Sequence, residues 1–149
     1  MNTKFHYIAR ALILSDNFVL IARAKGSKTT FLPGGHVESG ERAVDALSRE
    51  LKEEIGISIS DFKFLGCIEN IWKQDGERNA EINLIFATTS SALSYASPVI
   101  SKEAHIEFEW CHIDQLADKA LLPESLQTFI PEYISGRRSV LWASDGEWD

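Results

Sequence analysis

The most constraining feature of this chain is a cluster of three glutamates within positions 49–54, which read R-E-L-K-E-E. In a helix, Glu50, Glu53 and Glu54 are i, i+3 and i+4 neighbours, so their carboxylates share an arc of roughly 100°. Two unit charges some 5 Å apart repel by about 3 kcal/mol at an effective dielectric near 20. The cluster therefore favours a bound cation. Oxygen ligands without a neighbouring His or Cys favour Mg²⁺ or Mn²⁺ over zinc.

The surrounding residues predict an amphipathic helix. Its apolar positions share one stripe, with the carboxylates along the edge: Ala43, Val44, Leu47, Leu51 and Ile55. Ser39 is the expected cap, Glu41 lies in an acidic first turn, and Gly56 is placed as a C-terminal glycine. Arg49 and Glu53 are i, i+4 partners. We expect one flank of this helix to pack while the adjacent flank lines a cleft.

A glutamate-rich helical turn is more often a solvated face than a binding site. The preceding Pro33-Gly34-Gly35 favours the binding site here, because glycines permit backbone shapes that other residues resist and leave carbonyl groups accessible. Such carbonyls are further oxygen ligands for a hard cation.

The complete spacing resembles the signature of the Nudix hydrolases, and every position of the pattern is matched. The matching positions are Gly35, five residues, Glu41, seven residues, Arg49-Glu50-Leu51, one residue, Glu53-Glu54, one residue and Gly56-Ile57. The resemblance implies an α/β fold, namely an α/β/α sandwich with a mixed β-sheet in which the signature forms a loop-helix-loop. It also implies a metal-dependent enzyme, a pyrophosphohydrolase that cleaves a nucleoside diphosphate linked to another moiety by attack of water on phosphorus.

Site residues follow from the same resemblance, position by position. Glu50, Glu53 and Glu54 resemble the metal-binding glutamates, and the Gly35 carbonyl resembles an additional ligand. Arg49 and Glu41 resemble the pair that fixes the geometry of the motif. The general base stays open, with Glu54 and Glu50 as first choices and Glu103 as a candidate from a distant loop. Mg²⁺ is the expected cofactor, with Mn²⁺ as a substitute.

Substrate-binding residues are less specific. Arg23, Lys25 and Lys28 lie just before the motif and form either a solvated loop or contacts to substrate phosphates. Trp72 could stack on a base, although an indole on a strand more often packs in a core or at its rim.

Substrate identity is encoded outside the signature. Relatives that cleave ADP-ribose usually carry a proline soon after the motif, whereas none lies between Pro33 and Pro98. Tyr95 is too distant for the tyrosine of dinucleoside polyphosphate enzymes. These absences favour a nucleoside triphosphate or a small nucleotide derivative, and a capped or triphosphorylated RNA 5′ end stays open. The alternative of another class is a nucleotide-sensing domain without catalysis, which the intact set of glutamates disfavours.

Composition bounds the partners and the compartment. The 149 residues predict one domain, 1–149, and 15 basic against 22 acidic side chains give a net charge of −7. This charge disfavours long nucleic acid as a partner, and a homodimer is left open. No apolar run is long enough for a signal peptide or a membrane span, and two isolated cysteines, Cys67 and Cys111, favour a cytoplasmic protein.

The remaining elements are expected in a simple order. Strands at 7–14 and 18–24 and strands at 62–72 and 80–89 form two hairpins, with short strands at 30–32 and 57–59. A mobile loop at 90–104 precedes a strand at 106–113, Asp114 caps a short helix, and a second helix spans 124–134. The tail at 137–149 is assigned only to the surface.

Overall fold

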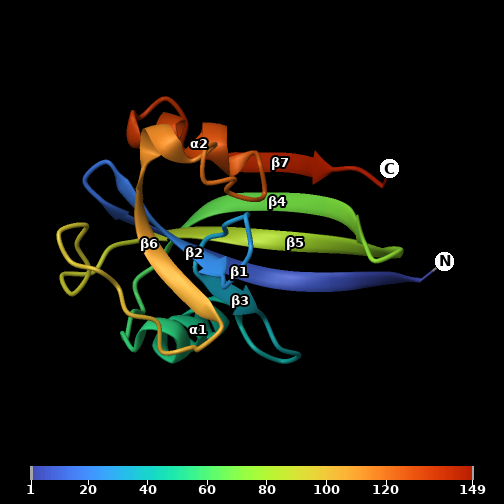
Figure 1. The fold of residues 1–149 in the computed structure, drawn as a ribbon, viewed down its shortest axis with the longest axis horizontal. Helices are drawn as coiled ribbons and strands as arrows, with labels where there is room; N and C mark the ends of the chain where they lie inside the picture. Colours follow the sequence, from blue (N-terminus) through green and yellow to red (C-terminus); the bar gives the residue numbers. More distant parts are fainter. Residues whose placement is uncertain (1, 149) are drawn as a thin grey trace.

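A sheet between two helices forms the centre of the computed structural model, which describes residues 2–148 (Figure 1). The strands are β1 Thr3–Ser15, β2 Phe18–Ala24, β3 Gly34–His36, β4 Lys63–Gln74, β5 Glu77–Thr88, β6 Ile106–His112 and β7 Leu141–Gly146. The helices are α1 Ala43–Ile55 and α2 Leu126–Ile134, with a short 3₁₀ helix, η1, at Ile113–Gln115.

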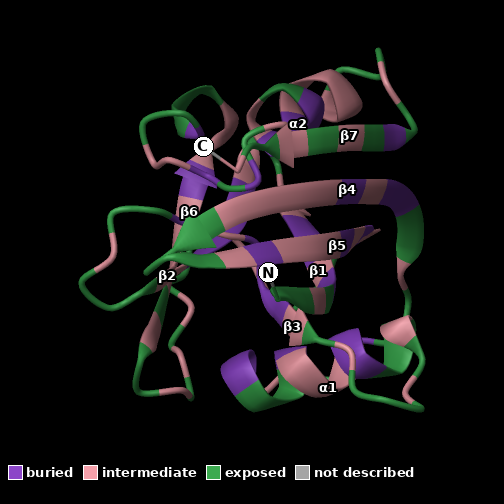
Figure 2. Ribbon diagram, turned by 90° about the vertical axis from the view of Figure 1, so that its right-hand side faces the viewer, coloured by how far each residue is buried: buried purple, intermediate pink, exposed green. Residues whose placement is uncertain are grey.

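The sheet is mixed. Its strands follow the order β6-β2-β1-β5-β4-β7, and β3 pairs with β1. β1 pairs with β5 in parallel, as β4 does with β7, whereas the other pairs are antiparallel. α1 covers one side of the sheet and α2 the other in both views (Figures 1 and 2). The predicted α/β/α sandwich is therefore confirmed.

Two separate cores hold these layers together. β1 contributes to both because successive side chains of a strand point to opposite faces. Leu12 is buried with Ile68 and Phe129 on the side of α2, while Ile13 is buried with Leu51 on the side of α1. Across the described residues, neither helix is long and apolar enough to cross a membrane.

Both predicted hairpins are confirmed, but the second is longer than expected. β4 and β5 pair up to Gln74↔Glu77, so the turn contains only Asp75 and Gly76. These two residues have φ values of 52° and 79°. Left-handed values at both central positions suit the right-handed twist of a two-residue hairpin.

Several predicted boundaries are wrong. Residues 30–32 form isolated bridges rather than a strand, and the short strand is β3, which pairs with β1. Residues 57–59 form no strand. Arg42, not Ser39, occupies the N-cap of α1, and the cap has no side-chain hydrogen bond. Gly56 ends the helix with φ 81° as predicted, whereas Val44 is exposed and Ala46 takes its place in the core.

The later elements also differ in detail. Residues 90–104 contain no helix or strand, as expected. The cap of η1 is His112, whose Nδ1 accepts a hydrogen bond from the Asp114 backbone N–H at 3.1 Å, rather than Asp114 itself. α2 begins at Leu126 instead of Glu124 and contains Pro131.

β7 lies in the tail that the sequence left unassigned. It pairs in parallel with β4, and Gly66 lies opposite Leu141. A side chain at Gly66 would collide with the Leu141 carbonyl group, and Gly66 has φ 148°. The close approach of the two backbones therefore requires glycine at this position.

Candidate functional site

The glycine turn, Gly34-Gly35, places main-chain atoms without side chains next to the acidic helix α1. β3 holds Gly34 opposite Arg10 and Gly35 opposite Ala9 of β1. A Cβ atom on Gly35 would lie 2.5 Å from the carboxyl carbon of Glu50, so this carboxylate occupies the space that any other residue would fill. Glycine at position 35 is thus what allows the Glu50 carboxylate to approach the main chain.

Glu54 lies beside Glu50 and is almost fully buried, with 5% of its surface exposed. The backbone of Gly34 provides one hydrogen bond to the carboxylate, but Oε2 is buried without a partner among the described residues. Burial, followed by the nearby Glu50 carboxylate, raises the pKa of Glu54 to about 7. An unpaired buried carboxylate oxygen is costly, which makes this position favourable for a cation.

Arg49 ties the signature loop to the helix. Its Nε donates to Oε2 of Glu41 at 2.8 Å, and its Nη2 donates to Oε1 of Glu41 at 3.0 Å. Nη1 donates to Oε1 of Glu50 at 3.1 Å, and Nη2 also donates to the carbonyl oxygen of His36 at 3.2 Å. The hydrogen bonds from Arg49 hold the pKa of Glu41 at about 2. These contacts join the loop that carries Glu41 to the helix that carries Arg49.

Glu53 is oriented differently from the other two signature glutamates. Its side chain is half exposed and lies 3.4 Å from Nη1 of Arg49. Within residues 2–148, no three His, Cys, Asp or Glu side chains are arranged to hold a metal ion. The donor set that fits a hard divalent cation here consists of the Glu50 and Glu54 carboxylates next to Gly35. Glu53 would have to leave Arg49 to join them.

The loop that carries Glu103 contacts the end of α1. The backbone N–H of Lys102 donates to the carbonyl oxygen of Glu54 at 2.8 Å. The negative charge of Glu103 contributes to the raised pKa of Glu54. The structure therefore brings the loop that carries Glu103 to the end of α1 that carries Glu54, although these two segments are far apart in the chain.

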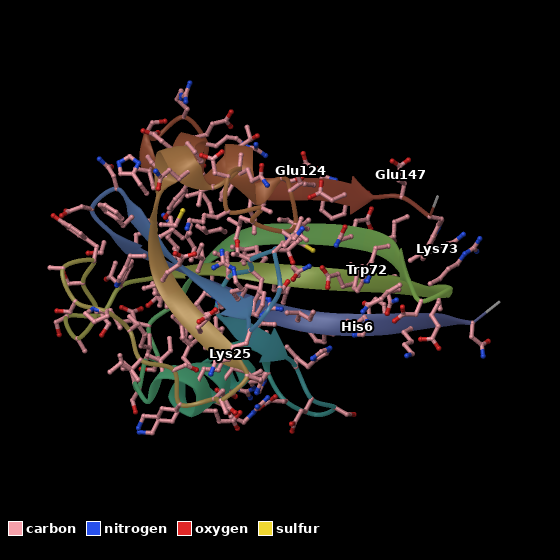
Figure 3. All side chains as sticks on the ribbon, in the orientation of Figure 1. His6, Lys25, Trp72, Lys73, Glu124 and Glu147 are labelled. Carbon is pink, nitrogen blue, oxygen red and sulfur yellow. The ribbon has the colours of Figure 1, made fainter. Side chains whose placement is uncertain are left out.

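A pocket of about 440 Å³ lies on the α2 side of the sheet, between β4, β5, β7 and the segment before the glycine turn. Its walls include Phe31 and Trp72, and its polar lining includes Arg10, Asn70, Glu81 and Asn83. Trp72 also stacks on the His6 ring with 5.7 Å between centroids (Figure 3). Trp72 is thus at a binding-sized pocket, as its predicted role requires.

The three predicted basic residues do not line this pocket. Arg23 pairs with Glu109 at 3.2 Å on the face of β2 and β6. Lys25 and Lys28 are exposed, and Lys25 lies apart from Trp72 in Figure 3.

Four polar pocket residues were missed at the sequence level. Glu81 accepts hydrogen bonds at Oε1 from Nδ2 of Asn70 at 3.1 Å and from Nδ2 of Asn83 at 2.9 Å. Arg10 interrupts the apolar run 7–14. A charged residue within an apolar strand is the one feature of the sequence that could have indicated a functional residue here. Asn70 and Asn83 lie in strands with ordinary alternation of polar and apolar residues. The contact between Asn70 and Glu81 could not be predicted without knowing how β4 pairs with β5.

Comparisons with known proteins agree with this geometry. The family profile described as NUDIX domain matches residues 4–133. An 8-oxo-dGTP diphosphatase of Buchnera aphidicola subsp. Schizaphis graminum is 29% identical over 76% of this chain and 82% of that protein. An RNA pyrophosphohydrolase of Halorhodospira halophila is 42% identical over 35% of this chain and 29% of that protein. The crystal structure of a MutT protein from Bacillus halodurans has a TM-score of 0.71 at 16% identity, covering 93% of this chain and 88% of the other.

Proposed function

This chain belongs to the NUDIX family of hydrolases, and we propose that it cleaves a phosphoanhydride bond of a nucleoside triphosphate or another small nucleotide derivative. The Glu54 carboxylate is the main support for this proposal. It is buried beside Glu50 against the glycine turn, and one of its oxygens has no partner among the described residues. A purely structural glutamate in this position would be expected to have its hydrogen bonds satisfied.

Nudix hydrolases generally need a divalent metal, and we propose Mg²⁺, with Mn²⁺ as a substitute. Glu50, Glu54 and the Gly35 carbonyl would hold the ion, with Glu53 as a further ligand. When bound, the ion supplies charge neutralisation for the phosphate oxygens and acidifies the attacking water.

The chain's own residues would perform the remaining tasks. Phe31 and Trp72 offer apolar surfaces on which a base can be buried, and the amides of Asn70 and Asn83 offer hydrogen-bonding groups. A carboxylate must accept the proton of the attacking water, and Glu54, Glu50 and Glu103 are the groups within the same site. Arg49 keeps Glu50 and the signature loop in place and does not need to touch the substrate.

A nucleoside triphosphate is the preferred substrate class. The relative from Buchnera, which aligns with most of this chain, is an 8-oxo-dGTP diphosphatase. The pocket volume of about 440 Å³ lies in the range of small-molecule sites and suits a nucleoside. The partner is then a small nucleotide, and the two free cysteines favour the reducing cytoplasm as the compartment.

An RNA 5′ end is the second candidate. The similarity to the RNA pyrophosphohydrolase of Halorhodospira halophila is local. One structural observation favours it as well. A second hollow, of about 300 Å³, is also lined by Trp72, together with His6 and Lys4, and would offer space for a following nucleotide.

A substrate panel separates these readings. The protein is incubated with Mg²⁺ and dGTP, 8-oxo-dGTP, ADP-ribose or a 5′-triphosphorylated RNA oligonucleotide, and products are resolved by ion-exchange chromatography. The proposal expects a nucleoside monophosphate and pyrophosphate from at least one triphosphate. Faster release of pyrophosphate from the RNA would favour the second candidate. Nucleotide binding without any cleavage would contradict both and favour a sensing domain.

A further inference from the structure

Arg10 occupies the junction between the pocket and the acidic helix. It lies on β1 opposite Gly34, and its guanidinium carbon is 5.0 Å from the centroid of the Phe31 ring. Its Nη1 donates to the carbonyl oxygen of Leu32 at 3.1 Å. These two contacts fix the plane of the guanidinium, and toward the described residues they use one of its N–H groups as a hydrogen-bond donor.

Among residues 2–148, no carboxylate forms an ion pair with Arg10. Burial is the largest influence on its pKa, which lies below the usual value, and the negative charges of Glu54, Glu81 and Glu50 act in the opposite direction. Arg10 is therefore a half-buried cation that is attracted by nearby carboxylates without contacting them. Its remaining N–H groups can donate hydrogen bonds to a bound anion.

The other charged residues around the pocket are all acidic. They are Glu81, Glu124, Asp145 and Glu147. Asp145 accepts a hydrogen bond from the Ser125 backbone N–H at 2.8 Å, whereas Glu124 and Glu147 are exposed lining residues. A phosphate would be repelled from most of this surface, and Arg10 offers the one basic group among the described lining residues.

We propose that Arg10 forms a phosphate subsite, in which its guanidinium binds the phosphate group attached directly to the nucleoside. This inference rests on the proposed function and adds the direction in which the substrate lies. The nucleoside occupies the pocket beside Trp72 and Phe31, and the phosphate chain runs past Arg10 toward Glu50 and Glu54. The planar guanidinium can donate two parallel hydrogen bonds to one phosphate, which an ammonium group cannot match.

A second arginine in the same chain provides a matched control. The guanidinium carbon of Arg138 lies 5.2 Å from the centroid of the Phe129 ring, so it also stacks on a phenylalanine. It differs from Arg10 because its Nη1 already contacts Oε2 of Glu132 at 3.3 Å. Arg138 does not line the pocket.

The test compares two ligands that differ only in the phosphate. Binding of deoxyguanosine and dGMP is measured by isothermal titration calorimetry at pH 7 in EDTA, so that no divalent metal contributes to affinity. The wild-type chain should bind dGMP more tightly than deoxyguanosine by about 10- to 100-fold, the size expected for charge-assisted hydrogen bonds. Arg10→Gln should reduce this ratio to near 1. Arg10→Lys should give an intermediate ratio, and Arg138→Gln should keep the wild-type ratio.

Different failures have different meanings. A wild-type preference for dGMP that persists in Arg10→Gln would overturn the phosphate subsite, as would a wild-type chain that binds both ligands equally. If Arg10→Gln does not fold, Arg10→Lys decides: a ratio equal to that of the wild type would overturn the role of the planar fork. A wild-type chain that binds neither ligand, nor any nucleotide in Mg²⁺, would instead contradict the proposed function.

Discussion

At the scale of single residues, the site depends on a carboxylate kept away from water. Glu54 has a raised pKa because it is buried beside Glu50, and the charge of Arg10 and the hydrogen bond from the Gly34 backbone compensate this only in part. Glu53, one residue earlier, is half exposed and faces Arg49. Neighbouring glutamates of one signature therefore have different environments, and their substitution should have different consequences.

The stability of the metal-free protein should reveal the burial of Glu54. A carboxyl group whose folded-state pKa is raised to about 7 binds its proton more tightly in the folded chain than in the unfolded chain. Its stabilising contribution is present below about pH 4.5 and is lost as the pH rises through 7. Glu54→Gln should therefore be more stable than the wild type at pH 8 in EDTA, by about 2 kcal/mol or roughly 5 °C in Tm, and similar to it near pH 5.

Thermal unfolding by circular dichroism between pH 5 and pH 8 measures this difference. Glu53→Gln is the matched control, because its side chain is half exposed and it should change Tm much less. Equal pH profiles for the wild type and Glu54→Gln would show that the Glu54 carboxylate is not held in a costly environment.

At the scale of the elements, two connections keep the site in shape. Arg49 joins α1 to the signature loop through Glu41 and the His36 carbonyl oxygen. β7 joins the chain end to β4, and Asp145 joins it to the start of α2 through Ser125. The first connection is local in sequence, whereas the second links segments far apart.

Arg49→Lys should weaken the first connection. A lysine retains the charge but cannot reproduce the forked contact with both oxygens of Glu41, so the free energy of unfolding should fall by about 1 to 3 kcal/mol. Urea denaturation at pH 7 measures this value. Arg138→Lys, which loses a single ion pair with Glu132, should cost less. A cost for Arg49→Lys no greater than for this control would contradict the role of the fork.

Gly66→Ala should separate β7 from β4, because the new side chain would meet the Leu141 carbonyl group. We expect faster amide hydrogen exchange in β7 and earlier proteolytic cleavage of the tail. Gly76→Ala is the control, since it also has positive φ but nothing lies within 4 Å of its added Cβ. Unchanged exchange in β7 of Gly66→Ala would contradict this pairing.

These elements also explain which parts could be predicted from the sequence. α1 was predictable because its apolar spacing, its acidic cluster and Gly56 all lie within one short segment. β7 was not predictable, because its stability comes from pairing with β4, and the paired residues, such as Gly66 and Leu141, are far apart in the sequence. The N-terminus of α1 could not be predicted from its cap, because the N-cap residue is Arg42 and makes no side-chain hydrogen bond, so the usual Ser, Thr, Asp or Asn signal is missing there.

At the scale of the whole molecule, the pocket is assembled from distant segments. Arg10 comes from β1, Trp72 from β4, Glu81 from β5 and Glu147 from the chain end. Sequence patterns therefore identified the acidic helix but placed the basic contacts at Arg23, Lys25 and Lys28, which the structure leaves outside the pocket. A chain with net charge −7 has little general attraction for phosphate, so binding should depend on local groups and on the metal.

The most direct test of the proposed hydrolysis compares the wild type with Glu54→Gln, using dGTP and 8-oxo-dGTP at saturating Mg²⁺. Release of pyrophosphate is followed over time, with EDTA as the metal-free control and circular dichroism to verify folding. We expect turnover by the wild type, none in EDTA, and a loss of about a hundredfold or more in Glu54→Gln, because the variant lacks a carboxylate at the site. Near-normal turnover in a folded Glu54→Gln would contradict the assigned site.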